Sequence, residues 1–190
     1  MRPVQNPERR ALRVGLQRKC GSSGFTLIEL LIVVAIILIL AAIAIPNLIQ
    51  SKIAANQASA AENVRTITSA SIIYYSSWAN GYPPSLQALS GTGTTSTCDQ
   101  ANLLDPLLST PPYQKSGYIY SYTGEGGPAV QGPGCGAPGF NGYLVTAVPL
   151  AVTTGTSSFC SDEPATIHVD TSGAAIPDQT TCEGLPALNH

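Results

Sequence analysis

The chain has 190 residues, of which 44% are hydrophobic and only 11% charged, and its formal net charge is −2. A chain of this length has room for one ordinary globular domain, with or without an appendage. So small a share of charged residues favours a membrane or secreted context over an ordinary soluble protein. The acidic balance beyond residue 25 gives no reason to expect nucleic acid as a partner.

The charges divide sharply along the chain. Six of the nine Lys and Arg residues lie before Phe25 with a single acid, Glu8, and this segment carries +5 while the remainder carries −7. A basic segment that precedes an apolar one tends to stay on the cytoplasmic side of a membrane. We therefore expect the residues after the apolar segment to lie in the periplasm.

Residues 25–45 form an apolar run that only Thr26 and Glu29 interrupt. A membrane-spanning helix needs about 20 such residues. A secretory signal peptide is the poorer interpretation, because its uncharged apolar core has only about 7–15 residues. A plain membrane anchor is a further alternative, since Glu29 lies near the cytoplasmic end, where a charge costs less than the roughly 2.5–3.5 kcal/mol at a helix centre.

The residues that begin the run read Gly-Phe-Thr-Leu-Ile-Glu at 24–29, after a basic stretch that ends at Lys19. This pattern resembles the class III signal of type IV pilins and type II secretion pseudopilins. The resemblance implies that a membrane prepilin peptidase cuts after Gly24 and that the new amine of Phe25 is N-methylated. Residues 1–24 would then be a cleaved leader, while the apolar helix at 25–45 would be kept.

The expected leader of 24 residues is longer than is usual in this family for a mature chain that begins with Phe. An alternative start codon at Val14 would leave Arg18 and Lys19 as the basic part of the signal. The mature protein is the same with either start.

The resemblance also assigns roles to Glu29 and Pro46. Cleavage creates a positive amine on Phe25, and where water is scarce the unpaired Glu29 of an incoming subunit is attracted to such an amine in the filament base. Pro46 removes a helical hydrogen bond, so we expect it to kink or locally melt the helix. The implied partners are further copies of the chain, the prepilin peptidase/methyltransferase and an inner-membrane assembly platform.

Residues 46–80 predict an amphipathic helix. Every seventh residue from Ile53 to Tyr74 is apolar, which gives a stripe that can pack on a globular head, with Val64 and Trp78 on a neighbouring strip. Gly81 and the prolines that follow it cannot continue the helix.

Residues 81–190 are rich in turn-forming residues and predict a β-rich head. We expect strands at 118–122, 142–148, 165–169 and 174–176, and a surface loop at 124–139. The predicted fold class is α+β and type IV pilin-like, with a long N-terminal helix, half transmembrane and half amphipathic, packed on a small antiparallel sheet of three or four strands.

Five cysteines are present, of which Cys20 would leave with the leader. An even number in an extracytoplasmic domain favours two disulfides. The other four cysteines allow three pairings, and we favour Cys98 with Cys135 and Cys160 with Cys182, because the second pair would clip the C-terminal segment beside the last hairpin. The absence of a Cys-x-x-Cys pair argues against zinc.

Candidate catalytic residues are few. His168 and Asp170 share a face of an expected strand, but a lone His-Asp pair arises by chance, and we interpret it as a solvent-facing strand edge. A calcium site would have to come from the scattered acids of the head, which form no dense ligand series. These acids are Asp99, Asp105, Asp162, Glu163 and Asp170. We therefore expect no catalytic residue, no metal site and no cofactor.

Together these patterns predict a structural subunit of a type IV pilus-like filament. A type II secretion pseudopilin, which serves protein export, is the first alternative, although the lack of a calcium-loop pattern favours a pilin. A membrane-anchored extracytoplasmic binding protein or enzyme is the alternative of another class. We expect a single-pass protein of the inner membrane with its head in the periplasm, which then enters a pilus, an extracellular filament or a periplasmic pseudopilus.

Overall fold

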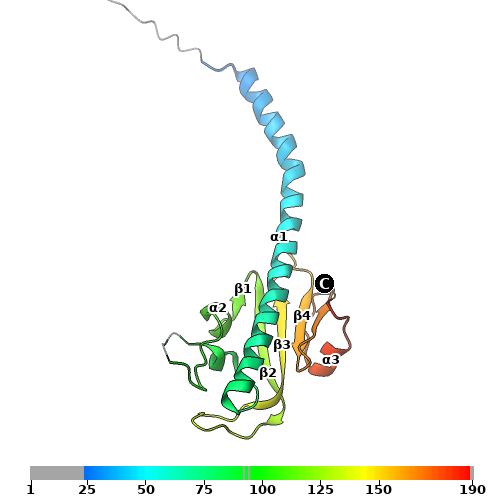
Figure 1. Ribbon diagram of the computed structural model, residues 1–190. Coiled ribbons are helices and arrows are strands. Elements are labelled where there is room, and N and C mark those ends of the chain that lie inside the picture. The colour runs from blue at the N-terminus through cyan, green and yellow to red at the C-terminus, as the bar shows by residue number, and fades with distance from the viewer. Residues whose placement is uncertain (1–23, 92, 94, 189–190) are drawn as a thin grey trace, which may run out of the picture. The chain divides into compact units, whose positions relative to one another are not determined.

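The computed structural model describes residues 24–91, 93 and 95–188 (Figure 1). The expected leader therefore lies outside the described residues except for Gly24. The chain divides into two units between Ala42 and Ile43, a few residues before the boundary that we expected at Pro46.

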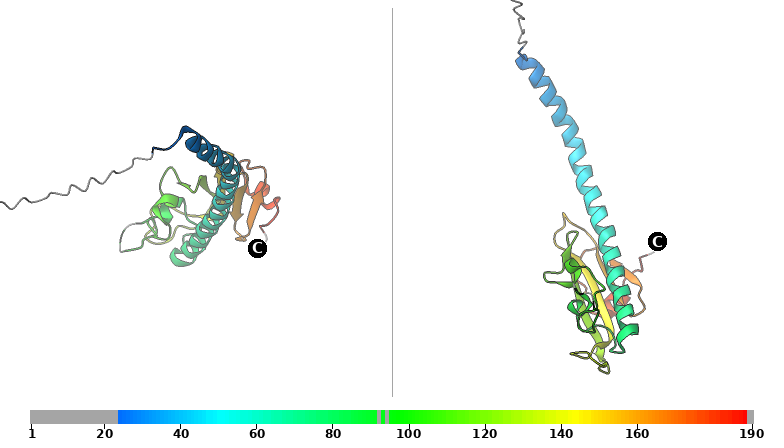
Figure 2. Two further views of the ribbon diagram at one scale, coloured as in Figure 1. Left: turned by 90° about the horizontal axis from the view of Figure 1, so that it is seen from above. Right: turned by 60° about the vertical axis from the view of Figure 1, so that its left-hand side comes forward.

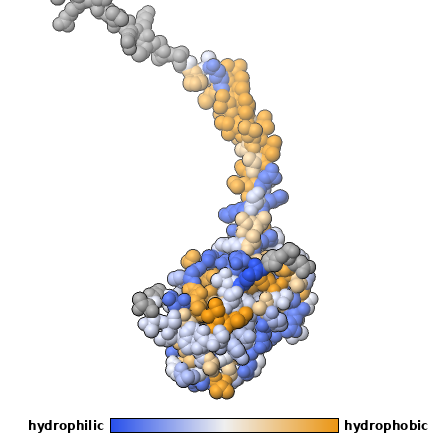
Figure 3. All heavy atoms as spheres, in the orientation of Figure 1, coloured by the Kyte–Doolittle hydropathy of each residue, from blue (hydrophilic) through white to orange (hydrophobic). Residues whose placement is uncertain are grey.

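The first unit holds the beginning of helix α1 (Leu27–Trp78). By length and composition α1 could cross a membrane, and none of its most apolar 18-residue window is buried. Figure 3 shows this part of the helix as an almost unbroken apolar surface. Side chains such as Leu38 and Leu40 are 64% and 63% exposed, so water would meet hydrocarbon here unless another surface covered it.

We expected Pro46 to kink or locally melt the helix, and of these two effects local melting is not found, because α1 continues through Pro46. A proline within a helix removes a single main-chain hydrogen bond. The residues on both sides of Pro46 keep helical conformation in the described chain.

The second unit is built on one five-stranded antiparallel sheet. Its strands lie side by side in chain order: β1 (Gln114–Lys115), β2 (Tyr118–Pro128), β3 (Phe140–Pro149), β4 (Ser158–Asp162) and β5 (Ile167–Asp170). Short helices complete the unit, namely η1 (Leu86–Leu89), α2 (Pro106–Ser109) and α3 (Gln179–Glu183). The α+β class with an antiparallel sheet is confirmed.

The sheet differs from the sequence prediction in three places. The loop expected at 124–139 is wrong in its first part, because β2 extends to Pro128 and pairs with β3 past an irregularity after Glu125. Gly124 permits this pairing, since a Cβ there would lie 2.1 Å from the ring of Phe140. The strand expected at 174–176 is not formed, and β1 and β4 were not predicted.

One face of the sheet is covered by the second part of α1 (Figure 2). Four side chains of the predicted stripe and its neighbour strip are buried at 0% exposure: Ala60, Val64, Ile67 and Tyr74. They join the core with Tyr118, Tyr143 and Phe159 of the sheet. The amphipathic prediction is therefore confirmed for the middle of the stripe, while Ile53 and Trp78 at its ends are half-buried.

The opposite face of the sheet is covered by the C-terminal segment that contains α3. Leu144 of β3 and Cys160 of β4 pack there against Ile176 and Cys182. This explains why residues 174–176 form no strand: Ile176 lies on the face of the sheet and not along its edge.

Candidate assembly site at the helix N-terminus

The first turn of α1 is closed by a reciprocal pair of contacts between Thr26 and Glu29. The backbone N–H and the hydroxyl of Thr26 donate to Oε2 of Glu29 at 2.9 and 2.7 Å, and the N–H of Glu29 donates to the Thr26 hydroxyl at 3.3 Å. The Thr26 carbonyl accepts from the N–H of Leu30. This is a capping box, in which Thr26 is the N-cap and Glu29 the third helical residue.

The capping box was missed in the sequence, although its pattern is present as Thr-x-x-Glu at 26–29 directly before an apolar run. It satisfies main-chain N–H groups that a helix leaves unpaired at its beginning. It also places the Glu29 carboxylate beside residues 25–26, where cleavage after Gly24 would create the amine of Phe25.

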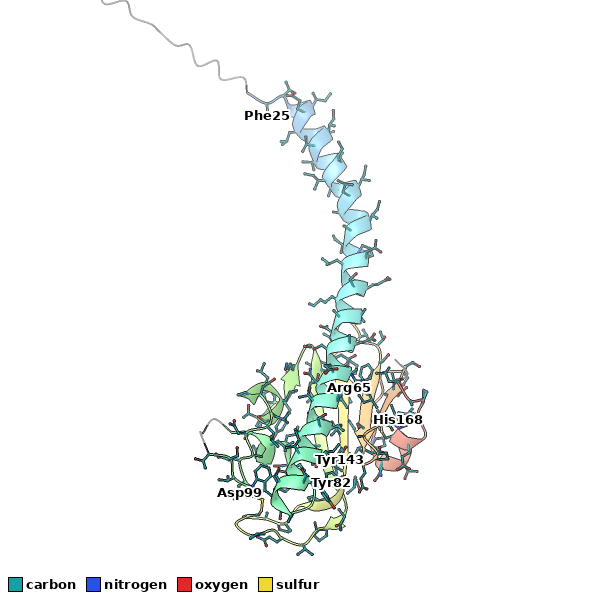
Figure 4. All side chains as sticks on the ribbon, viewed as in Figure 1. Phe25, Arg65, Tyr82, Asp99, Tyr143 and His168 are labelled. Carbon is teal, nitrogen blue, oxygen red and sulfur yellow. A yellow bond between two sulfur atoms is a disulfide. The ribbon has the colours of Figure 1, made fainter. Side chains whose placement is uncertain are left out.

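Figure 4 labels Phe25 just before this turn, and the Phe25 side chain is 88% exposed. Gly24 has open space around it, with no atom within 4 Å of a Cβ built there. The geometry thus presents an accessible Gly-Phe bond, a satisfied carboxylate and an uncovered apolar helix in one continuous stretch.

Comparison with known proteins decides the character of this stretch. A family model described as the prokaryotic N-terminal methylation motif matches residues 19–45. The chain carries a prepilin-type N-terminal segment. It is also 53% identical over 53 residues of its N-terminal region to the type IV major pilin protein PilA of Myxococcus xanthus strain DK1622.

The matched stretch covers 28% of this chain and 24% of that pilin, so the chain matches about a quarter of its relative's length. No solved structure gives a significant match. The resemblance to pilins therefore rests on the prepilin-type segment together with the helix-on-sheet architecture of the second unit.

The other candidate residues are spread over the head. His168 lies on β5, and its Nδ1 donates to the Leu185 carbonyl at 2.7 Å (Figure 4). Asp170 accepts instead from the N–H and hydroxyl of Ser172 in the turn after β5. The solvent-facing edge expected here is wrong, because residues 186–188 bond to β5 and leave His168 half-buried.

The five acids considered as calcium ligands do not converge. Asp99 accepts from the N–H of Gly136, whereas Asp105 caps α2 and pairs with Lys115 at 2.6 Å. Asp162 is fully buried at the end of β4, at 0% exposure. Among the described residues, no three His, Cys, Asp or Glu side chains lie close enough together to hold a metal ion.

The structure contains the two disulfides that we favoured. Cys98 is joined to Cys135 with a Cα–Cα distance of 5.1 Å, and Cys160 is joined to Cys182 at 6.0 Å. The first links the connection after α1 to the loop between β2 and β3, and the second attaches the C-terminal segment to β4. Each closes a loop, which typically stabilises a small domain by roughly 2–4 kcal/mol.

Buried tyrosines between α1 and the sheet are held in their protonated form. Burial raises the pKa of Tyr120 to about 12, although the hydrogen bond from Asn63 acts in the opposite direction. Burial likewise raises the pKa of Tyr122 and of Tyr143, whose rings lie parallel with centroids 6.0 Å apart. These hydroxyls therefore stay protonated at neutral pH in the core between α1 and the sheet.

Proposed function

We propose that the chain is a structural subunit of a type IV pilus-like filament. In this proposal a prepilin peptidase cuts after Gly24, Phe25 is N-methylated, and α1 assembles with the α1 helices of other copies. The observation that carries the proposal is the prepilin-type segment at 19–45, which leads directly into an apolar helix that nothing in the described chain covers.

The uncovered helix explains why α1 would need an apolar environment both before and after assembly. Fully burying a Leu or Ile side chain contributes about 1.5–3 kcal/mol, and the first part of α1 consists largely of such residues. The bilayer would cover them before assembly, and neighbouring helices would cover them in the filament. The subunit would thus wait in the inner membrane, with its head in the periplasm, for an assembly platform to extract it.

Glu29 would guide the register of assembly. Its carboxylate already accepts two hydrogen bonds from Thr26. An amine on Phe25 would add a positive charge beside it, and the same carboxylate could accept the amine of a neighbouring copy. Because opposite charges attract strongly where water is excluded, such a pair would specify the axial position of the incoming subunit.

A pilus is favoured over a secretion pseudopilus by the similarity of the N-terminal region to a protein named a type IV major pilin. A membrane-anchored enzyme would need polar side chains that converge in a cleft of the head. His168, Asp105 and Asp170 instead bond the C-terminal segment, a helix cap and a turn.

The proposal is tested by replacing Glu29 in cells that make the protein. Glu29→Ala should leave cleavage after Gly24 largely intact, as the mass of the protein shows, and should reduce the yield of sheared filaments at least ten-fold. Glu62→Ala is the matched control, since Glu62 is an exposed acid on the same helix and should leave the yield unchanged.

A full yield of filaments from Glu29→Ala would contradict the assembly role of this residue. If the wild-type chain were absent from surface filaments but required for export of other proteins, the pilus proposal would give way to a pseudopilus. Uncleaved wild-type protein in the membrane would contradict processing altogether.

A further inference from the structure

Asp162, the last residue of β4, is a carboxylic acid sealed inside the head. Its exposed fraction is 0%, and neither carboxyl oxygen has a hydrogen-bond partner. An ionised carboxylate in such a place loses its hydration and gains nothing in return, so it is driven to take up a proton.

Asp162 lies on the face of the sheet that the C-terminal segment covers. Asp162 pairs with Leu144 of β3, which places its side chain on the face that also carries Cys160. That face is covered by residues 174–184, here named the C-terminal cover, through Ile176 and Cys182. Beyond the cover, residues 186–188 are bonded to β5, as in the contact of the Val169 N–H with the Pro186 carbonyl.

Several groups on neighbouring elements affect the pKa of Asp162. Burial raises the pKa of Asp162, and the carboxylate of Glu183 in α3 raises it further. His168 on β5 and the main-chain N–H of Asp162 itself lower this pKa, while the neighbouring Glu163 adds to the rise. The charge of the Asp162 carboxylate in turn contributes to the raised pKa of the Tyr143 hydroxyl on β3.

A bound metal ion would be another way to satisfy a buried carboxylate. In the described part of the chain, however, no three His, Cys, Asp or Glu side chains form a group that could bind one. A proton needs only the carboxylate itself, and it would also relieve the repulsion from Glu183.

We propose that a proton on Asp162 holds the C-terminal cover against the sheet, and that the cover loosens when this proton is lost as the pH rises. The direction of the pH effect follows from the raised pKa of Asp162 in the closed state. In the open state Asp162 meets water and has its ordinary affinity for protons, whereas in the closed state that affinity is higher. The contribution of Asp162 to closure is therefore fully present below the ordinary pKa of an Asp side chain. It is lost as the pH rises through the raised pKa of Asp162 in the closed state.

The loosening would be local. The Cys160–Cys182 disulfide keeps the cover attached to β4, and the hydrogen bonds of residues 186–188 hold the chain beyond it. The device would thus expose the outer face of the sheet, including Leu144, without unfolding the head. It does not depend on the proposed filament function.

The two disulfides provide the readout. In full-length protein in detergent micelles, a phosphine reductant would be applied between about pH 4 and pH 8, a range that covers titration of a buried carboxyl. The ratio of the reduction rate of Cys160–Cys182 to that of Cys98–Cys135 cancels the pH dependence of the reagent. We expect this ratio to increase several-fold as the pH rises.

Asp162→Asn, which keeps the shape but cannot ionise, should make the ratio independent of pH. Asp178→Asn is the matched control: Asp178 is an exposed N-cap of α3 that Asn can replace, and this variant should keep the wild-type rise. Glu183→Gln removes a repelling charge and should move the midpoint of the rise to lower pH.

A flat wild-type ratio, or a rise that survives in Asp162→Asn, would overturn the proposal. If Asp162→Asn does not fold, Glu183→Gln provides the test. An unchanged midpoint of the rise with pH in this variant would contradict the role of the buried acid. If a metal chelator changes the ratio of the two reduction rates in the wild-type protein, the proposal is overturned, because a bound cation and not a proton then holds the C-terminal cover.

Discussion

The carboxylate of Glu29 accepts both the backbone N–H and the hydroxyl of Thr26, at 2.9 and 2.7 Å. The residue for which we propose a role in assembly is thus also a structural part of the first helical turn. Glu29→Ala removes one partner of the capping box as well as a charge, whereas Glu29→Gln removes the charge and keeps a side chain that can complete the box. A variant of Thr26 removes the N-cap and keeps the charge of Glu29.

We expect Thr26→Val to fray the beginning of α1 without affecting the head. Loss of an N-cap side chain costs about 1 kcal/mol, which corresponds to roughly five-fold faster amide exchange in the first turn. Exchange measured by NMR in micelles checks this. Thr66→Val is the control, since the exposed Thr66 hydroxyl only bonds the Glu62 carbonyl within the same helix. Unchanged exchange at residues 27–30 would show that the capping box is not formed.

The contact between α1 and the sheet predicts a contrast between two isoleucines of the same helix. Ile67 is 0% exposed and Ile73 is 49% exposed. Ile67→Ala should destabilise the head by about 2–5 kcal/mol, because it leaves a cavity in the core. Ile73→Ala should change the free energy of unfolding by less than about 0.5 kcal/mol. Denaturant unfolding of the full-length protein in micelles measures both, and equal effects would contradict the packing described here.

The ion pair between Asp105 and Lys115 predicts a small loss of stability in acid. The hydrogen bond from Lys115 lowers the pKa of Asp105, with a further contribution from the Leu107 N–H. The stabilising contribution is therefore present above the ordinary pKa of Asp105 and is lost as the pH falls through the lowered one. Both side chains are partly exposed, so the pair contributes at most about 1 kcal/mol.

Lys115→Met should raise the pKa of Asp105, which NMR titration of its carboxyl measures. The pKa of Asp178 serves as the internal reference, since it is lowered by its own contacts with Thr181 and should not change. A pKa of Asp105 that stays the same in Lys115→Met would show that capping of α2 alone is responsible.

Parts of the head lay beyond sequence-based prediction for identifiable reasons. Every residue of β4 (Ser158–Asp162) is buried on both faces, so the strand lacks the alternation of apolar and polar residues by which a half-buried strand is found. β1 has two residues and exists only because Gln114 and Lys115 meet β2. Residues 174–176 have strand-like composition, yet they cross over the sheet to bury Ile176.

The sequence by itself determined the prepilin-type segment, the membrane-length helix, the end of α1 after Trp78 and the α+β class. These depend on the order of neighbouring residues and on periodicity along one helix, which are local properties. Only the tertiary structure decided that the far face of the sheet is covered by the C-terminal segment and that Asp162, on the same face, is fully buried. Burial of a side chain between segments distant along the chain depends on which surfaces meet, and no local pattern encodes that.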